Sequence, residues 1–405
     1  MISVGIDVAK GKSTVCILKP YGEIVSRPFD ISHTEKDLHA LATMILRFDD
    51  DVKVVLESTG IYHLPVLTYL QERGIFVALI NPYLMKMYRS EDLRKAKTDN
   101  IDSRIIANYG IDHWFSMKEY TVAEDTYYEL KILSQQYRHY MELHISALLD
   151  LTHLLELTMP GIKTMFTSWK EASNRDKLGD FVERFWHFDT ITCLDESEFV
   201  EEYINWAKEK KYHQNTAKAK AIYAMAREGI PSLPSTTPSV KMLVLEAVRV
   251  LKEIDATLMH ILTRMQLLSK SLPEYSVVRN MSGVGDVLAP KLIAEIGDVR
   301  RFHNGKALIA FAGIDPPPYE SGQFVATNRK ITKRGSSHLR KVGYEVMRSI
   351  KAHPNPDDSV YQYIVKKESE GKAKKAAKIA GLNKFLRIYY ARGRCEIFSV
   401  NSDLL

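Results

Sequence analysis

The stretch Ile2-Ser-Val-Gly-Ile-Asp7-Val-Ala-Lys-Gly-Lys-Ser-Thr-Val-Cys-Ile-Leu18 decides the fold of the N-terminal part of this chain. Ile2 to Asp7 and Ser13 to Leu18 are short β-rich runs, and a third run, Glu23 to Phe29, follows the turn Pro20-Tyr-Gly22. The three runs predict a β-meander.

Alternating helix and strand patterns follow the meander: a helix over His33 to Phe48, a buried strand over Val52 to Leu56, a helix from about Tyr62 to Arg73 and a strand over Ile75 to Ile80. A last helix begins near Asp99 and carries Ile101, Ile105 and Ile106 on one face. The order βββαβαβ predicts an α/β domain over residues 1–118, so the fold class is α/β followed by an all-α remainder.

Two long helices with a 3-4 apolar spacing are predicted in the middle of the chain, which we assign to residues 119–272. Their seams consist of Leu130, Leu133, Tyr137, Tyr140, His144, Ala147, Leu151 and Leu154, and of Leu251, Ile254, Leu258, Ile261, Met265 and Leu268. The seams predict either an antiparallel pair within one chain or a dimerising coiled coil, which would give a dimer or tetramer. We interpret His144 as a core residue rather than a ligand, and residues 161–228 as an inserted helical subdomain.

Residues 273–405 form the predicted C-terminal domain. Met281-Ser-Gly-Val-Gly-Asp286 has the form of a helix-hairpin-helix turn, in which Gly283 and Gly285 would let backbone N–H groups approach a nucleic-acid phosphate. Such turns also end ordinary helices. A helix over Ala307 to Ala312 then leads into the proline-rich loop 315–322.

Composition limits the class of protein. The 405 residues correspond to about two to three domains, and no apolar run reaches the ~18 residues of a membrane span. Cys16, Cys193 and Cys395 lie too far apart in sequence for a Cys-x-x-Cys zinc pair, and they suggest no disulfide framework. With no secretory signal visible at Met1, we expect a cytoplasmic, nucleoid-associated protein and no membrane partner.

Positive charge is concentrated near the C-terminus. Residues 321–400 hold 18 Lys and Arg against 6 Asp and Glu, a net charge of +12, while the remainder of the chain has a net charge of −6. Lys372, Lys374, Lys375 and Lys378 form the densest part of this segment. A solvated lysine-rich helix explains such a run, but the interleaved aromatic residues favour nucleic-acid binding.

Four acidic residues carry the predicted chemistry. Asp7 and Glu57 end two predicted strands, and Asp99 and Asp102 share one face at a helix start. Taken singly, Asp99 could be a helix cap completed by Asp102, and Glu57 a surface charge. Together, four unpaired carboxylates are tolerable when Mg²⁺ or Mn²⁺ compensates them, which predicts two-metal phosphoryl transfer.

The chain resembles the DEDD transposases of the insertion-sequence one-ten family, whose N-terminal domain is similar to RuvC resolvases and ribonuclease H. The N-terminal motifs that carry the resemblance are Gly5-Ile-Asp7-Val-Ala-Lys10, Leu56-Glu57-Ser-Thr-Gly60-Ile-Tyr62, Val77-x-x-Ile-Asn-Pro82 and Lys97-Thr-Asp99-x-x-Asp102. The C-terminal ones are Ser282-Gly-Val-Gly285, Ala294-Glu-Ile-Gly-Asp298, Phe311-Ala-Gly-Ile-x-Pro316, Glu320-Ser-Gly322 and Ile331-Thr-Lys-Arg-Gly335-x-x-x-Leu-Arg340.

The resemblance implies that Asp7, Glu57, Asp99 and Asp102 are catalytic and hold Mg²⁺ or Mn²⁺. It also implies that Ser321 attacks a DNA phosphodiester to form a phosphoserine intermediate. A structured non-coding RNA of the element, the bridge RNA, would guide the enzyme to donor and target DNA. The expected nucleic-acid-binding residues are Lys97, Gly283, Gly285, Arg329, Lys330, Lys333, Arg334, Arg340 and the four lysines Lys372, Lys374, Lys375 and Lys378.

Two other classes share part of this pattern. An actin-like ATPase or sugar kinase also begins with a Gly-Ile-Asp hairpin followed by Lys-Ser-Thr, but it would need a second phosphate loop and has no use for a basic tail. A metal-dependent RuvC-like structure-specific nuclease shares the acidic residues but has no use for Ser321. A covalent protein–DNA adduct would distinguish the recombinase from the nuclease.

Overall fold

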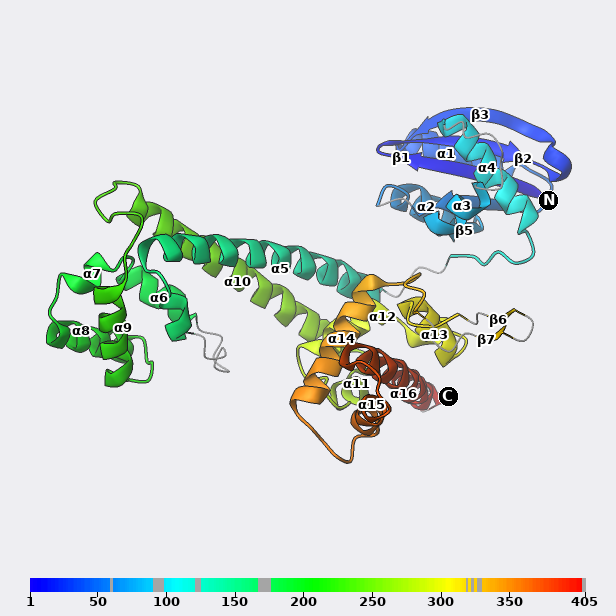
Figure 1. The fold of residues 1–405 in the computed structure, drawn as a ribbon. Coiled ribbons are helices and arrows are strands. Elements are labelled where there is room, and N and C mark those ends of the chain that lie inside the picture. Colours follow the sequence, from blue (N-terminus) through cyan, green and yellow to red (C-terminus); the bar gives the residue numbers. More distant parts are fainter. Residues whose placement is uncertain are drawn as a thin grey trace. The chain divides into compact units, whose positions relative to one another are not determined.

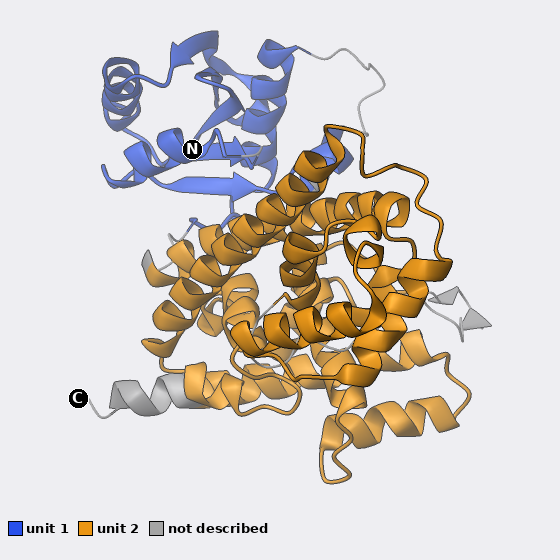
Figure 2. Cartoon of the chain, turned by 90° about the vertical axis from the view of Figure 1, so that its left-hand side faces the viewer, with its two compact units in different colours: residues 1–122 blue, residues 123–405 orange. Residues whose placement is uncertain are grey.

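The computed structural model describes residues 1–58, 61–89, 98–120, 125–166, 176–317, 320–321, 324–325 and 330–402. The chain divides into two units, Met1–Val122 and Ala123–Leu405 (Figure 2). The predicted boundary at residue 118 lies close to this division, whereas the one at residue 272 falls inside the second unit. Within the described ranges, no helix is long and apolar enough to cross a membrane.

A five-stranded mixed sheet forms the centre of the first unit (Figure 1). Its order is β3-β2-β1-β4-β5, with the bounds Ile2–Ala9 (β1), Lys12–Leu18 (β2), Ile24–Ser32 (β3), Val52–Glu57 (β4) and Val77–Ile80 (β5). β1, β2 and β3 pair antiparallel, as the meander predicts, and β4 pairs parallel with both β1 and β5. The predicted order of strands and helices is therefore confirmed up to β5.

Helices cover both faces of this sheet. α1 (Glu35–Leu46) and α2 (Leu64–Gln71) share a core with residues such as Ile6 and Leu56. α3 (Pro82–Arg89) and α4 (Asp99–Asp112) contribute Met85 and Ile106 to a second cluster around Val55. The sequence predicted α4 but not α3, a helix of eight residues that begins at a proline.

A glycine sets the distance between α4 and the sheet. A Cβ atom on Gly5 of β1 would lie 2.3 Å from the Ala107 nitrogen and 2.4 Å from the Ser103 carbonyl oxygen, both backbone atoms of α4. On α4 itself, a Cβ on Gly110 would lie 2.2 Å from Ser3 Oγ. Because backbone atoms cannot yield as a flexible side chain can, only glycine permits this approach at position 5.

Two long helices of the second unit, α5 (Asp125–Thr158) and α10 (Val240–Lys270), pack side by side along their length (Figure 1). Leu130 of α5 shares a core with Met265 of α10, whereas Leu151 shares a different core with Val244. The start of one helix therefore packs against the end of the other, which is the antiparallel arrangement within one chain. His144 lies on this interface, with Nδ1 2.9 Å from Asp255 Oδ1.

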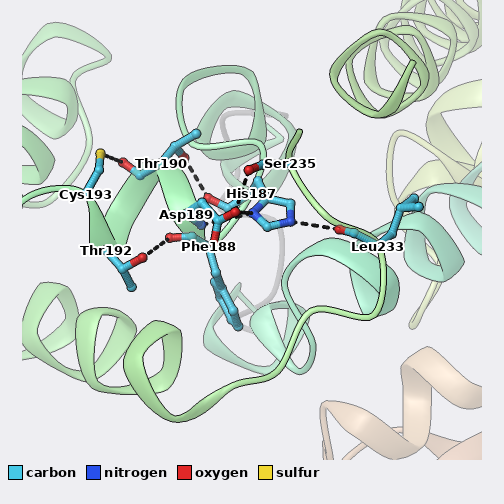
Figure 3. A network of polar contacts seen from close by, with 8 residues as sticks. All are labelled: His187, Phe188, Asp189, Thr190, Thr192, Cys193, Leu233 and Ser235. Atoms are coloured by element: carbon cyan, nitrogen blue, oxygen red, sulfur yellow. Dashed lines mark hydrogen bonds and ion pairs between the residues drawn. The ribbon is translucent and has the colours of Figure 1, made fainter. Parts of the chain in front are cut away.

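The inserted segment is helical, as expected, with η2 (Ile162–Phe166), α6 (Lys177–Arg184), α7 (Asp189–Thr192), α8 (Glu196–Glu209) and α9 (Thr216–Glu228) around an aromatic core. The buried His187 connects it to the linker before α10 (Figure 3). His187 Nδ1 accepts a hydrogen bond from the Asp189 N–H at 2.9 Å, and Nε2 lies 2.9 Å from the Leu233 carbonyl oxygen. This histidine is thus a structural residue that holds the linker against α7.

The C-terminal part packs around one hydrophobic core that also takes in the start of α5 and the end of α10. Its elements are α11 (Tyr275–Arg279), α12 (Leu288–Ile296), η3 (Val299–Arg301), α13 (Gly305–Ala312), β6 (Glu320–Ser321), β7 (Phe324–Val325), α14 (Ser337–Ala352), α15 (Ser359–Ser369) and α16 (Lys374–Ser402). The buried Glu295 of α12 accepts hydrogen bonds from Lys131, Ser134 and Arg138 of α5. This network fixes the long helix to the C-terminal core.

The contact at Gly5 makes a first prediction. Gly5→Ala should lower the free energy of unfolding of the first unit by about 3 kcal/mol, because β1 and α4 must separate to admit the methyl group. Denaturant unfolding followed by far-ultraviolet circular dichroism measures the change. Gly393→Ala, within α16, is the matched control. A Cβ atom at position 393 would lie 3.7 Å from Val299 Cγ1, which is an ordinary van der Waals contact. That variant should unfold at the same or a slightly higher denaturant concentration.

Candidate active site and nucleic-acid interface

Two of the predicted acids lie on neighbouring strands at the same end of the sheet. Gly5 pairs with Val55 and Ile6 with Leu56 in the parallel ladder of β1 and β4, so Asp7 and Glu57 follow next on each strand. Asp7 and Glu57 are half-buried. The sheet therefore brings the first two acids together, as the strand pattern predicted. The prediction that Asp7 ends its strand is wrong, because β1 continues to Ala9 along its antiparallel pairing with β2.

The other two acids belong to the first turn of α4. Thr98 Oγ1 accepts a hydrogen bond from the Ile101 N–H at 3.3 Å, so Thr98 is the N-cap of this helix. The interpretation of Asp99 as the cap is wrong, because the residue before it already fills that role. Asp102 is 5% exposed, whereas Asp99 is exposed.

The electrostatics of Asp7 show that the other three acids all act on it. Burial raises the pKa of the Asp7 carboxyl to about 6, and the negative charges of Asp102, Asp99 and Glu57 contribute in the same direction. Arg89 opposes them and lowers the pKa. A cation that approaches this carboxyl therefore stabilises its charged form.

Arg89, the last residue of α3, is the cation that reaches this cluster. Its Nη2 lies 3.2 Å from Glu57 Oε2 and its Nη1 3.6 Å from Asp102 Oδ1. Arg89 Nε is buried without a hydrogen-bond partner among the described residues, so the guanidinium is incompletely satisfied there. On the outer side, Lys12 Nζ lies 3.6 Å from Asp99 Oδ2.

Arg89 is a residue that the sequence interpretation missed, because α3 itself was missed. The signal was present in Asn81-Pro82, since proline is favoured at the first position of a helix. A helix begun there carries Arg89 two turns later to the end of the sheet where β4 also ends.

The donor set suits a hard divalent cation, since Asp7, Glu57, Asp99 and Asp102 supply oxygen ligands alone. Within the described ranges, however, no three His, Cys, Asp or Glu side chains lie close enough together to hold a metal ion. The chemistry of the ligands therefore fits Mg²⁺ or Mn²⁺, while the side chains are arranged as a carboxylate cluster that Arg89 compensates.

Ser321 belongs to the second unit. It is the last residue of β6, and it pairs with Phe324 of β7 in a short antiparallel hairpin. The base of the hairpin is held by the Thr332 N–H, which donates to the Asp315 carbonyl at 3.1 Å, and by the Lys333 N–H, which donates to the Gly313 carbonyl at 2.9 Å. Lys97 and Arg329 lie outside the described residues.

The two glycines of the predicted phosphate-binding turn differ. A Cβ on Gly283 would lie 2.4 Å from Ile350 Cγ1 and 3.0 Å from the Val346 carbonyl oxygen, so this glycine is needed for packing against α14. A Cβ on Gly285 would meet nothing within 4 Å. The backbone is therefore accessible to a partner at Gly285 but packed at Gly283.

The predicted basic residues also divide into groups. Arg340 Nη1 donates to the carbonyl oxygens of Ala312 at 2.9 Å and Gly335 at 3.1 Å, so Arg340 holds the end of α13. Four of the lysines, Lys330, Lys333, Lys372 and Lys375, line a single cavity. Arg334, Lys374 and Lys378 lie outside its lining.

Comparison with known protein families covers both ends of the chain. Residues 4–160 match a family model for the DEDD transposases of IS110 elements, described as "Transposase", and residues 275–362 match one described as "Transposase IS116/IS110/IS902 family". Each end of the chain is therefore similar to one domain of the IS110-family transposases. The first match contains the four acids and the second contains Ser321, in agreement with the predicted class of DNA transposase or recombinase.

Individual relatives agree with this assignment. The chain is 22% identical over 374 residues to the "Insertion element IS116 uncharacterized 44.8 kDa protein" of Streptomyces clavuligerus, a match that covers 91% of this chain and 89% of the relative. It is 30% identical over 118 residues to the "Pilin gene-inverting protein" of Moraxella bovis and to that of Moraxella lacunata. These two matches cover 29% of this chain and 35% of the relatives, so the chain spans about a third of their length.

The raised pKa of Asp7 predicts a pH-dependent stability. A carboxyl whose pKa is about 6 in the folded protein, but about 3.9 when unfolded, binds its proton more tightly in the folded state. Its contribution to the free energy of unfolding therefore falls as the pH rises from about 4 to about 7. In EDTA, Asp7→Asn should be more stable than the wild type at pH 7, and the difference should shrink at pH 5.

Denaturant unfolding at the two pH values measures this difference. Asp49→Asn serves as the control, because it removes an exposed carboxylate just before β4 and outside the cluster. A loss of stability in Asp7→Asn at pH 7 would show that the charged form of Asp7 is favoured in the folded protein.

Proposed function

We propose that this chain is a DNA transposase that cuts and rejoins the strands of a mobile element through a phosphoserine intermediate. The observation that carries the proposal is the gathering of Asp7, Glu57, Asp99 and Asp102 around one end of the sheet, in a chain whose two ends are each similar to one domain of the IS110-family transposases. The order of these acids, Asp-Glu-Asp-Asp, is the DEDD pattern after which the N-terminal family is named. The relatives named for pilin gene inversion support a DNA rearrangement.

The topology of the first unit supports a RuvC- and ribonuclease-H-like interpretation. An antiparallel meander forms one side of the sheet, and β4 and β5 extend it in parallel on the other side of β1. Asp7 lies two residues before the end of the central strand β1, and Glu57 is the last residue of its parallel neighbour β4. Nuclease chemistry of this kind needs carboxylates that the sheet itself holds in place.

Asp7, Glu57, Asp99 and Asp102 are the residues that would hold Mg²⁺ or Mn²⁺. When bound, such ions supply positive charge to the transferring phosphate and to the oxygens that attack and leave. Arg89 contacts Glu57 and Asp102 and offsets part of the cluster's charge. Arg89 and the buried position of Asp102 keep the carboxylates oriented.

The reaction requires the acids and Ser321 to act on the same phosphate. The Ser321 hydroxyl oxygen attacks phosphorus, the bond from phosphorus to the leaving nucleoside oxygen breaks, and that oxygen takes up a proton. The proton of the serine passes to a carboxylate of the acidic cluster, for which the raised pKa of Asp7 is suited. The proposed mechanism therefore requires the acids and Ser321, of one chain or of two protomers, to bind the same stretch of DNA.

The proposed partners are donor and target DNA, a bridge RNA and further copies of the chain. The basic segment 321–400, with its net charge of +12, supports nucleic-acid binding. Exposed apolar residues of α5, among them Ile145 at 51% and Leu149 at 64% exposure, support self-association along the long helices.

The acidic cluster predicts metal-dependent cleavage. Asp7→Asn, Glu57→Gln and Asp102→Asn should each lower the rate of strand cleavage in Mg²⁺ by roughly 10²-fold or more, because each removes a charged ligand while preserving the side chain's volume. Cleavage of labelled DNA on a denaturing gel, with Asp49→Asn as the control, measures the rates. Cleavage at the wild-type rate by Asp102→Asn would remove the metal assignment.

Ser321 predicts a covalent intermediate. The wild type incubated with labelled donor DNA and Mg²⁺ should give a protein–DNA adduct that survives denaturation, because the link is a phosphodiester to serine. Ser321→Ala should bind the same DNA with unchanged affinity yet give neither adduct nor strand exchange. Denaturing gel electrophoresis before and after protease treatment detects the adduct.

The same experiment tests the alternative, a metal-dependent RuvC-like nuclease. In that enzyme water attacks the phosphate, so Ser321→Ala would cleave as fast as the wild type and no adduct would form. Ser337→Ala is a suitable control, since this exposed serine lies in the first turn of α14 outside the hairpin.

A further inference from the structure

One large cavity lies in the C-terminal part of the second unit, with a volume of about 1080 Å³. It is lined by residues before and after the Ser321 hairpin, by Tyr363 of α15 and by the first half of α16 together with the residues just before it. Pockets that hold a compact organic ligand have volumes of roughly 300–1,000 Å³, so there is room here for a nucleotide.

The charge of this cavity is of one sign. Six of its lining residues are basic, namely Lys330, Lys333, Lys372, Lys375, Lys384 and Arg387, and its lining contains no Asp or Glu. Five of the six are exposed, and only Lys384 is half-buried. Six like charges around one space repel each other, so the cavity attracts an anion with several negative charges.

The interior of the cavity is apolar. Ile314 is 2% exposed, and Ile331, Ile379 and Ala380 are half-buried. The isoleucines of the lining are less exposed than five of the six basic residues, so aliphatic side chains line the less accessible part of the cavity. Contact with these apolar side chains would not stabilise an inorganic anion. A planar base would bury its apolar faces against them, which is favourable.

An aromatic ring completes the lining. Tyr363 is half-buried, and the Nζ atoms of Lys384 and Lys367 lie 5.3 Å and 5.5 Å from its ring centroid. Nucleic-acid-binding proteins commonly stack an unpaired base on such a ring and hold the neighbouring phosphates with lysine or arginine. Duplex DNA keeps its bases stacked inside and could not use this surface.

The position of the cavity relates it to the proposed nucleophile. Pro316 and Lys330, which lie on either side of the hairpin in sequence, both belong to the lining. Ser321 is five residues from Pro316, so its Cα lies at most about 18 Å from that of Pro316. A nucleotide that contacts Pro316 in the cavity would thus lie within about two nanometres of Ser321.

We propose that this cavity binds one unpaired nucleotide of a single-stranded nucleic acid, with its base against Ile314, Ile379 and Tyr363 and its flanking phosphates on the lysines. The inference rests on the proposed function, since it assigns to the recombinase a site that holds a strand out of its duplex near Ser321. Binding of the base, rather than of the backbone alone, is the property that distinguishes it from a general basic surface.

Anisotropy of a fluorescein-labelled oligonucleotide of about 12 nucleotides tests the proposal, in EDTA so that no strand is cut. Single-stranded DNA, single-stranded RNA, the DNA duplex and an abasic strand with the same number of phosphates are compared with the full-length chain. We expect one of the two single strands to bind about tenfold more tightly than both the duplex and the abasic strand. The preferred strand identifies the source of the nucleotide as DNA or RNA.

Variants locate the binding to the cavity. Ala376→Trp, at an exposed lining position where folding is not disturbed, should weaken binding of the preferred strand about tenfold and leave the abasic strand unaffected. Tyr363→Ala should act similarly, and Tyr363→Phe should restore binding. Val365→Trp, on an exposed position of α15 outside the lining, is the matched control.

The lysines give a second measurement. Lys372→Gln with Lys375→Gln should reduce the slope of log K against log salt by about 1.4, because two phosphate contacts are lost. Lys208→Gln with Lys241→Gln removes the same charge from exposed positions of α8 and α10 and should leave the slope unchanged.

Equal affinity of the wild type for abasic and base-containing strands would overturn the proposal, as would an unaltered affinity in Ala376→Trp. These outcomes are independent of the recombinase assignment, because Ser321→Ala and the EDTA conditions leave binding intact. A recombinase that gives a serine adduct but binds abasic strands equally well would disprove the cavity assignment alone. Base-dependent binding without any adduct would disprove the serine mechanism alone.

Discussion

The close approach of α4 to β1 is the constraint on which the acidic site depends. Asp7 lies two residues after Gly5 on the strand, and Asp102 lies one residue before Ser103 on the helix, so the backbone contact at Gly5 sets the separation of the two carboxylates. A side chain at position 5 would displace the helix by the thickness of a methyl group or more. Asp7 would then be less buried and further from the charge of Asp102, and these are the two largest causes of its raised pKa.

This arrangement is electrostatically unfavourable and lowers the stability of the first unit. Negative charges lie close together at one end of the sheet, and burial makes the charge of Asp7 harder to solvate. Arg89 relieves the cost only in part, since its Nε stays without a partner among the described residues. A site of this kind is typical of functional rather than purely structural clusters, because a stable ion-pair network would satisfy its donors more fully.

Much of this arrangement could be predicted from sequence because it follows from strand periodicity. Strands β1 and β4 are visible in the apolar runs before Asp7 and Glu57, and their pairing brings the acids together. Arg89 could not be predicted in the same way, since a helix of eight residues has little periodic signal and only its starting proline marked it. The role of Thr98 as N-cap was concealed by the acidic Asp99 beside it, because either residue type is a good cap. The cavity combines residues about 70 positions apart in sequence, so no local pattern indicates it, although its lysines were visible as a charge run.

The antiparallel helices α5 and α10 have a structural consequence for the second unit. Helices of 34 and 31 residues are about 50 Å long, and the two ends of the pair enter different hydrophobic cores. The pair therefore connects the core of the inserted helices to the C-terminal core through continuous helix. A partner that binds the inserted helices therefore binds beside a core separate from the one next to the cavity, and α5 and α10 are the continuous structure between the two.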